Sequence, residues 1–199
     1  AALHRAASAP DAELARLGER LAAVAGDEGL LDVAYRTVDS PFGSLLVAAT
    51  PAGVVRVAFD VEGHDRVLAQ LAGSISPRVL ASPRGTEQVA RELDEYFAGR
   101  RTDFDVAIDL QLVRGFRRQV VEQLAGIPFG ATRSYAQVAR SAGNPAAVRA
   151  VGSACSHNPV PLVLPCHRVV RSDGTVGQYL GGAEVKVALL EMESARVRR

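Results

Sequence analysis

The sequence is poor in the residues that characterise several protein classes. It contains no tryptophan, one methionine and two cysteines, and aromatic residues make up 5% of its 199 positions. Cys155 and Cys166 alone give neither a disulfide framework nor the four ligands of a structural zinc site. The apolar runs are short and interrupted by charge, and the first residues lack the apolar core of a secretory signal. We therefore expect a cytoplasmic protein that needs no metal or other cofactor and does not associate with membranes.

The net charge of +1 conceals an asymmetry along the chain. Residues 114–199 contain twelve Arg or Lys and five Asp or Glu, a balance of +7, whereas residues 1–113 contain eleven and seventeen, a balance of −6. A basic C-terminal half joined to an acidic N-terminal half indicates an anionic partner, and nucleic acid is the first candidate. The alternative is a solvated basic face with no specific partner.

The N-terminal half has the pattern of a helix followed by a small α+β unit. Residues 10–25 place Leu14, Leu17, Leu21 and Val24 at helical spacing, and Gly26 could end that helix. Residues 31–59 contain three β-rich runs separated by the turn sequences DSPFG and TPAG, which predicts an antiparallel meander.

Two further elements complete the N-terminal half. We expect a helix over about 84–98, beginning near Thr86, and a half-buried strand over 102–109. No cluster of polar residues in this half suggests a site. Because the charge changes sign near 110–115, we expect three parts: a helical extension over 1–29, an α+β domain over 30–112 and a C-terminal domain over 113–199.

The C-terminal half contains the pattern of a helix-turn-helix. A helix comes first, over 116–127, with Phe116, Val120 and Leu124 on one face. Ser134 followed three residues later by Gln137 is a capping box, and it opens the helix SYAQVARSA. Gly143 would end that helix, Asn144 would cap the next one and Pro145 would occupy its first position. Two short helices across a glycine-containing turn form a helix-turn-helix, although helical hairpins without a ligand share this spacing.

The second helix of the pair is nearly smooth. Residues 145–154 consist of Pro, Ala, Val, Gly and Ser, with Arg149 as the one long polar side chain. A helix that reads bases in the major groove needs several Asn, Gln, Arg or Lys residues. This helix therefore either packs in the core or approaches DNA closely through its backbone, with Arg149 as an isolated probe.

The sequence LPCHRVV at residues 164–170 places a cysteine beside a histidine. The apolar residues 160–164 resemble a buried strand that ends at Pro165, which puts Cys166 at a strand end or turn. A nearby imidazole could activate the thiol, but neighbouring residues on a strand point to opposite faces, so contact with His167 requires a turn or a bridging water. From these residues alone, an inert core cysteine and a Cys–His hydrolase both remain open.

The segment from about Phe116 to Glu193 resembles the O-6-alkylguanine-DNA alkyltransferases, also called methylated-DNA–protein-cysteine methyltransferases. The matching stretches, in the family's order and spacing, are FRRQV, IPFGATRSYAQVA, GNPAAVRAVG, NPVPLVLPCHRVV, DGTVGQYLGG and KVALLEME. The resemblance implies an α+β fold, with a small ribonuclease-H-like N-terminal domain and a mainly helical C-terminal domain carrying the helix-turn-helix.

The resemblance also implies the reaction. A single-turnover methyltransferase of this family moves an alkyl group from O-6-alkylguanine in duplex DNA, and less readily from O-4-alkylthymine, to a cysteine that matches Cys166. His167 would act as its base through a bridging water, and Glu193 would orient His167. Tyr135 would donate a proton to the departing guanine, and Asn158 would brace the turn that holds Cys166.

The expected DNA contacts follow from the same resemblance. Arg149 matches an arginine finger that replaces the nucleotide flipped out of the stack, while small side chains let the helix lie in the minor groove. The residues expected to contact DNA beside Arg149 are Ala147, Ala150, Gly152, Ser134 and Tyr135. The residues expected to form the alkylguanine pocket are Pro161, Val169, Gln178, Tyr179, Leu180 and Gly181.

Three positions depart from the family pattern. Gln178 replaces a commoner Asn, Leu180 replaces a small polar residue and would reshape the pocket, and Ser156 replaces a basic residue of some members. We expect a monomer that binds alkylated double-stranded DNA, with self-association on DNA left open, and a nucleoid location if the source is bacterial. A lesion-binding protein without transfer activity and a Cys–His hydrolase remain the alternative classes.

Overall fold

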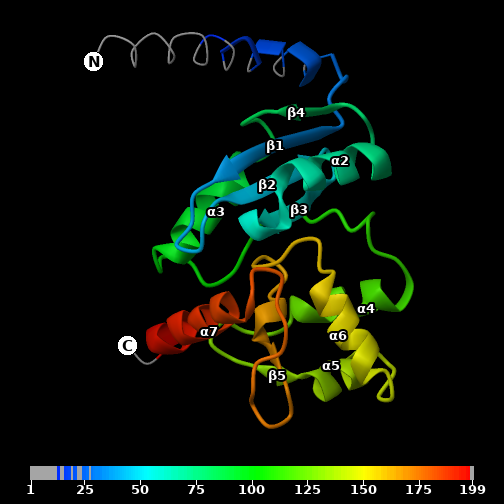
Figure 1. Cartoon of the computed structure of the whole chain (residues 1–199), viewed down its shortest axis with the longest axis vertical. Helices are drawn as coiled ribbons and strands as arrows, with labels where there is room; N and C mark the ends of the chain where they lie inside the picture. The colour runs from blue at the N-terminus through cyan, green and yellow to red at the C-terminus, as the bar shows by residue number, and fades with distance from the viewer. Residues whose placement is uncertain (1–12, 14–15, 19, 22–23, 27, 198–199) are drawn as a thin grey trace.

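The computed structural model describes residues 13, 16–18, 20–21, 24–26 and 28–197. A four-stranded sheet with two helices forms one half of the molecule, and four helices with short connecting turns form the other (Figure 1). The α+β fold predicted from the sequence is confirmed. Within the described part of the chain, no helix has the length and apolar character needed to cross a membrane.

The predicted antiparallel meander is present. Strands β1 (Val33–Val38), β2 (Leu45–Thr50) and β3 (Gly53–Phe59) pair in sequence order. A short fourth strand, β4 (Val79–Ala81), adds to β1 in the parallel direction, so the order across the sheet is β3-β2-β1-β4. The β2–β3 turn requires Gly53, whose φ of +139° brings its backbone against that of Ala107, where a side chain would clash.

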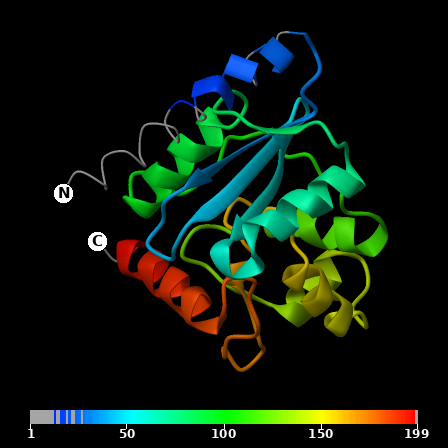
Figure 2. The same cartoon turned by 45° about the horizontal axis from the view of Figure 1, so that its top comes forward.

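The strands alternate between two buried faces. On β2, Leu46 and Ala48 pack toward helix α2 (His64–Ser74), whereas Leu45 and Val47 pack toward helix α3 (Glu87–Phe97) and the C-terminal half. Leu45 and Val47 belong to one core cluster that continues from the sheet into the C-terminal helices. Figure 2 shows the sheet above these helices. The sheet therefore supports the C-terminal half directly, while the division of the chain into three parts stays a prediction.

The C-terminal half begins with helix α4 (Gly115–Leu124), which buries Val120 and Leu124 as predicted. The helix-turn-helix follows as α5 (Tyr135–Ser141) and α6 (Val148–Ser156). Next come the 3-10 helix η2 (Cys166–Arg168) and the long last helix α7 (Ala183–Val197). Strand β5 (Arg133–Ser134) pairs in parallel with β6 (Val169–Val170), and this pairing fixes the start of α5 beside the segment that follows η2.

The structure corrects two predictions of strands. Residues 102–109 alternate in burial as expected, but they form only an isolated bridge between Ile108 and Val54 and no strand. Residues 160–164 are buried as expected, but they form turns. Leu162 has a φ of +74°, a conformation that no strand accommodates.

The start of the second helix of the pair is also corrected. Helix α6 begins at Val148, and its N-cap is Ala147, without a side-chain cap. Asn144 instead accepts a hydrogen bond from the Ala147 amide through its backbone carbonyl, in a turn that contains Pro145. In contrast, the predicted capping box of Ser134 and Gln137 is present at the start of α5.

The structure describes part of the predicted N-terminal helix. The described residues between 13 and 26 are helical, and Leu14 lies outside the described residues. The side chains of Leu17, Leu21 and Val24 are each more than half exposed, so this apolar stripe is not packed on the rest of the chain.

Candidate active site

Cys166 and His167 lie on a single 3-10 turn rather than on a strand. The Cys166 amide donates to the Leu164 carbonyl at 2.8 Å, and the Arg168 amide donates to the Pro165 carbonyl at 3.0 Å. On a strand, neighbouring side chains point to opposite faces, and a 3-10 turn does not impose this separation. Both side chains are buried, with 1% of Cys166 and none of His167 exposed.

Asn158 stabilises the segment that leads into this turn. Its side-chain amide donates to the Leu164 carbonyl at 2.7 Å, and its side-chain oxygen accepts from the Val160 amide at 3.1 Å. The same side chain is near the Cys166 thiol and acts to lower its pKa. Asn158 is fully buried, and its two hydrogen bonds connect the start of this segment to Leu164, as expected for a residue that braces the turn.

Glu193 on α7 is the centre of a polar cluster. Its Oε1 accepts hydrogen bonds from His167 Nε2 at 2.9 Å and from the Tyr96 hydroxyl at 2.8 Å. Arg168 donates to both carboxylate oxygens at 2.9 to 3.2 Å, and the Gly130 amide donates to Oε2 at 2.9 Å. A buried carboxylate with donors on both oxygens is stable as an anion.

The protonation states of this cluster follow from its contacts. Burial alone would raise the pKa of Glu193, but the hydrogen bonds from His167 and Arg168 outweigh it and lower the pKa to about 2. Burial lowers the pKa of His167, and the bond to Glu193 only partly offsets this effect. The resting pair is therefore a neutral imidazole beside an ionised carboxylate, so Nε2 carries the proton and Nδ1 is the free acceptor. Nδ1 is buried without a hydrogen-bond partner among the described residues.

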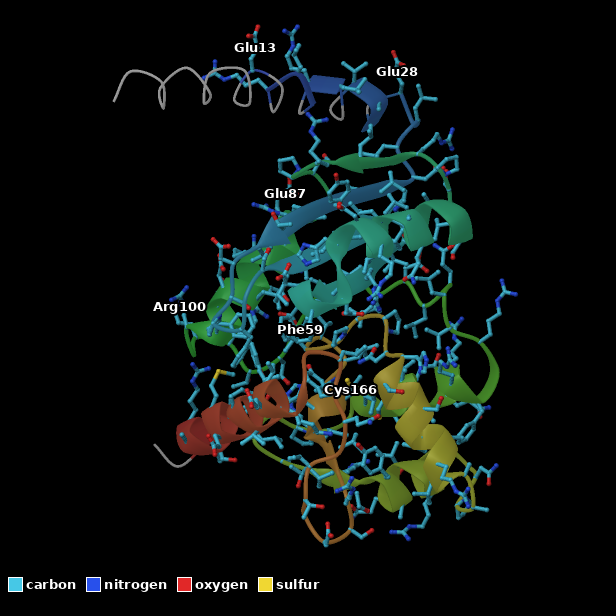
Figure 3. The ribbon with its side chains drawn as sticks, viewed as in Figure 1. Glu13, Glu28, Phe59, Glu87, Arg100 and Cys166 are labelled. Atoms are coloured by element: carbon cyan, nitrogen blue, oxygen red, sulfur yellow. The ribbon has the colours of Figure 1, made fainter. Side chains whose placement is uncertain are left out.

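The thiol of Cys166 is covered in this conformation. Burial raises the pKa of Cys166 to about 11, although Asn158 and Lys186 act in the opposite direction. Tyr179, in the loop over 177–182, is one of the residues near the thiol. The ring of Tyr179 lies 5.5 Å from that of Phe59 and 6.2 Å from that of His167, measured between centroids. Figure 3 shows Phe59 and Cys166 close to the junction of the two halves. The thiol thus belongs to the residue directly before a histidine base in the chain, and it is shielded from solvent.

Tyr135 and Lys186 flank the cysteine on the other side. Lys186 Nζ donates to the Val169 carbonyl at 2.6 Å and to the Tyr135 hydroxyl at 3.4 Å, and it lies 5.6 Å from the centroid of the Tyr135 ring. Burial, together with the nearby thiols Cys155 and Cys166, raises the pKa of Tyr135 to about 12. Tyr135 therefore carries its proton at neutral pH, beside a cation that can stabilise its loss.

A hollow of about 470 Å³ opens on the helix-turn-helix side of the site. Four of the residues predicted for DNA contact or the base pocket line it: Tyr135, Arg149, Gly152 and Gln178. The exposed positions of α6 are Val148, Arg149, Ala150 and Ser153, so its outer face is small apart from one arginine. A second hollow of about 360 Å³ lies along Ser156, Tyr179 and Leu180.

The remaining predicted residues take other places. Ser134 caps α5, and Ala147 caps α6 and is partly buried. Pro161 and Val169 are buried, and the Val169 carbonyl is occupied by Lys186. Gly181 packs so closely that a Cβ on it would lie 2.9 Å from the Phe59 ring.

The sequence reasoning missed three residues of the site: Arg168, Lys186 and Tyr96. Arg168 adjoins the Cys–His pair, so its position was a usable signal. Lys186 is a lysine with 1% exposure in the last helix, and Tyr96 is 97 positions away from Glu193. Neither burial nor this pairing can be read from the order of residues. Within the described part of the chain, no group of three His, Cys, Asp or Glu residues could hold a metal ion.

Comparisons with known families match both halves of the chain. The model of the 6-O-methylguanine DNA methyltransferase ribonuclease-like domain matches residues 33–110, and that of the DNA binding domain of the same proteins matches residues 115–195. A methylated-DNA–protein-cysteine methyltransferase of Mycobacterium bovis is 39% identical over 164 residues, which cover 81% of this chain and 93% of that protein. A protein of the same name from Mus musculus is 37% identical over 172 residues, 80% of each chain.

Solved structures agree with the sequence matches. The O6-methylguanine methyltransferase of Mycobacterium tuberculosis superposes with a TM-score of 0.70 at 36% identity, covering 82% of this chain and 94% of that one. The structure of Mycobacterium tuberculosis OGT in complex with DNA gives a TM-score of 0.69 at 37% identity and the same coverage. The resemblance inferred from the sequence is confirmed, and the chain belongs to the 6-O-methylguanine DNA methyltransferase family.

Proposed function

We propose that this protein repairs DNA by moving an alkyl group from O6 of guanine, and less readily from O4 of thymine, to Sγ of Cys166. The single observation that carries this proposal is the buried pair of His167 and Glu193, in which Nε2 lies 2.9 Å from Oε1. His167 directly follows Cys166 in the chain. The pair lies in a chain whose two halves match the family. A cysteine with a pKa raised by burial needs an adjacent base, and the free Nδ1 of His167 is the acceptor available for that proton.

The transfer forms one bond and breaks one. His167 takes the thiol proton through a bridging water, and Sγ attacks the alkyl carbon as its bond to O6 breaks. The electron pair of that bond stays on the purine, which takes a proton from Tyr135. Lys186, at 3.4 Å from the Tyr135 hydroxyl, stabilises the resulting phenolate. Glu193 stabilises the imidazolium without taking its proton.

The DNA has to present the base outside the duplex. The target atom lies inside the stack, so the nucleotide rotates out at a cost of a few kcal/mol. The exposed Arg149 would enter the gap, and the small residues around it would allow α6 to lie in the minor groove. Because the thiol is buried, part of the protein has to move before the base can reach it, and we expect this to be the loop over 177–182, whose Tyr179 lies near Cys166.

The stable thioether implies one transfer per molecule. We expect incubation with O6-methylguanine duplex to give one methyl group per protein, located by mass spectrometry on the peptide that contains Cys166. A hydrolase would turn over repeatedly, and a lesion-binding protein would leave the lesion intact. A methyl group on any other peptide contradicts the assignment of Cys166.

The role of Arg149 can be separated from transfer. Arg149→Ala should slow repair of duplex DNA more than reaction with free O6-alkylguanine base, because extrusion is needed only in the duplex. Arg140→Ala is the matched control, since Arg140 is exposed at the end of α5. Equal losses for Arg149→Ala on both substrates would refute the finger.

A further inference from the structure

The sheet-bearing half of the molecule reaches directly into the His167–Glu193 pair. Tyr96, in the last turn of α3, donates its hydroxyl to Glu193 Oε1 at 2.8 Å, the same oxygen that accepts from His167 Nε2. The Tyr96 side chain is fully buried. A residue of the N-terminal half therefore forms a hydrogen bond with the same carboxylate oxygen as the proposed base, His167.

The geometry of Tyr96 is fixed from several sides. Its ring packs against those of Phe97, Phe104 and Phe129, with centroids 5.3 to 6.1 Å apart. Arg196, three residues after Glu193 on α7, donates to the Tyr96 carbonyl at 2.7 Å and to the Phe97 carbonyl at 2.8 Å. Two residues of α7, Glu193 and Arg196, thus bind the end of α3, and the packed rings hold the Tyr96 hydroxyl against Glu193.

We propose that Tyr96 is a positioning residue of the transfer reaction, which draws charge away from Glu193 Oε1 and so limits how strongly Glu193 stabilises protonated His167. This inference rests on the proposed function. A hydrogen bond to a carboxylate oxygen weakens that oxygen as an acceptor for its other partner. Without the hydroxyl, Oε1 holds the imidazolium more strongly, and His167 keeps its proton to a higher pH.

Other ionisable groups face the same pair from each element packed against it. They are Arg168 from η2, Lys186 from α7 and Tyr179 from the loop over 177–182, and Cys166 precedes His167 on η2. Arg168 and Lys186 oppose a charge on His167, and Glu193 favours it. The Tyr96→Phe change leaves all these groups and the aromatic packing in place, so it removes one hydrogen bond from an otherwise unchanged set.

The test compares Tyr96→Phe with Tyr35→Phe in the full chain. Tyr35, on β1, is partly buried, and its hydroxyl has no hydrogen bond to any described residue. In single-turnover repair of methylated duplex, we expect the acid limb of the rate profile to move up by about one pH unit in Tyr96→Phe and not in Tyr35→Phe. A uniform loss of rate at all pH values, or equal shifts in both variants, overturns the proposal.

A second measurement keeps this proposal separate from the proposed function. The titration of His167 in the free protein, followed by NMR and assigned with His167→Asn, needs no substrate. An upward shift of about one pH unit in Tyr96→Phe alone supports the role of Tyr96 even if no methyl group is transferred. If transfer occurs and the titration is the same in all proteins, the role of Tyr96 is rejected while the repair function stands.

Discussion

The two nitrogen atoms of His167 face regions of opposite character. Nε2 faces Glu193, whose carboxylate accepts from His167, Tyr96, Arg168 and the Gly130 amide. Nδ1 has no hydrogen-bond partner among the described residues, and the hydroxyl of Tyr179, whose ring packs edge-on against that of His167, is equally unpaired. Unpaired buried polar atoms cost about 1–3 kcal/mol each. The Glu193 side is thus complete before substrate arrives, whereas the Cys166 side is suited to change when a base enters.

The largest effect is expected from a substitution of Glu193, whose carboxylate has all its hydrogen-bond partners in place. Glu193→Gln leaves the buried guanidinium of Arg168 without its counter-charge, and removing one partner of a buried pair costs about 3–5 kcal/mol. We expect urea unfolding to show a loss of stability in this range. Repair should slow as well, because His167 loses the anion that stabilises its protonated form.

The matched control lies on the same helix. Glu191 is exposed on α7, and Glu191→Gln should leave the free energy of unfolding within about 0.5 kcal/mol of the wild type. Similar losses for both variants would mean that the cost reflects α7 in general and not the polar cluster.

A smaller effect is expected on the Cys166 side. Gly181→Ala would place a Cβ 2.9 Å from the Phe59 ring, so the loop over 177–182 or the ring has to shift. Overpacking of this kind costs about 1–3 kcal/mol. We expect faster alkylation of Cys166 by iodoacetamide in Gly181→Ala, measured in a Cys155→Ser background so that one thiol remains.

The control for this change is Gly126→Ala, where the nearest atom to the added Cβ is 3.6 Å away. That variant should leave the alkylation rate unchanged. If Gly181→Ala reacts at the same rate as its background, the loop is not what shields the thiol.

Local signals in the sequence predicted much of the fold. The meander, α3, α4 and the capping box of Ser134 follow from turn residues and periodicity, which act over a few positions. The strand predicted over 160–164 was wrong because apolar character reports burial and not backbone shape. There the side chain of Asn158 binds the Leu164 carbonyl and favours a turn.

The site divides in the same way. Cys166 and His167 are neighbours in the chain, so their proximity in sequence was visible directly. Glu193 was predicted from the family resemblance, and its hydrogen bond to His167 agrees with that prediction. Tyr96 could not be predicted, because its hydroxyl reaches Glu193 only after α3 and α7 pack together. The prediction that the N-terminal half contains no site residue would therefore be wrong if Tyr96 acts as proposed.

The last expected effect is in the pH dependence of stability, where an acid limb comes from Glu193 and an alkaline limb from Cys166. The pKa of Glu193 is lowered to about 2, so its contribution is present above about pH 4.5 and is lost as the pH falls toward 2. The pKa of Cys166 is raised from near 9 to about 11, so its contribution is present below pH 9 and is lost as the pH rises toward 11.

Cys166→Ser should remove part of the alkaline limb. Between pH 9 and 11, unfolding of the wild type releases the Cys166 proton, which lowers stability by at most about 1.4 kcal/mol per pH unit. The variant should lose stability less steeply by that amount and keep the acid limb, measured by urea unfolding at each pH. The buried Cys155 contributes its own fall in both proteins, so only the difference between them reports Cys166. Identical alkaline limbs would mean that the Cys166 thiol ionises as easily in the folded protein as in the unfolded chain. Burial would then not shield this thiol from solvent.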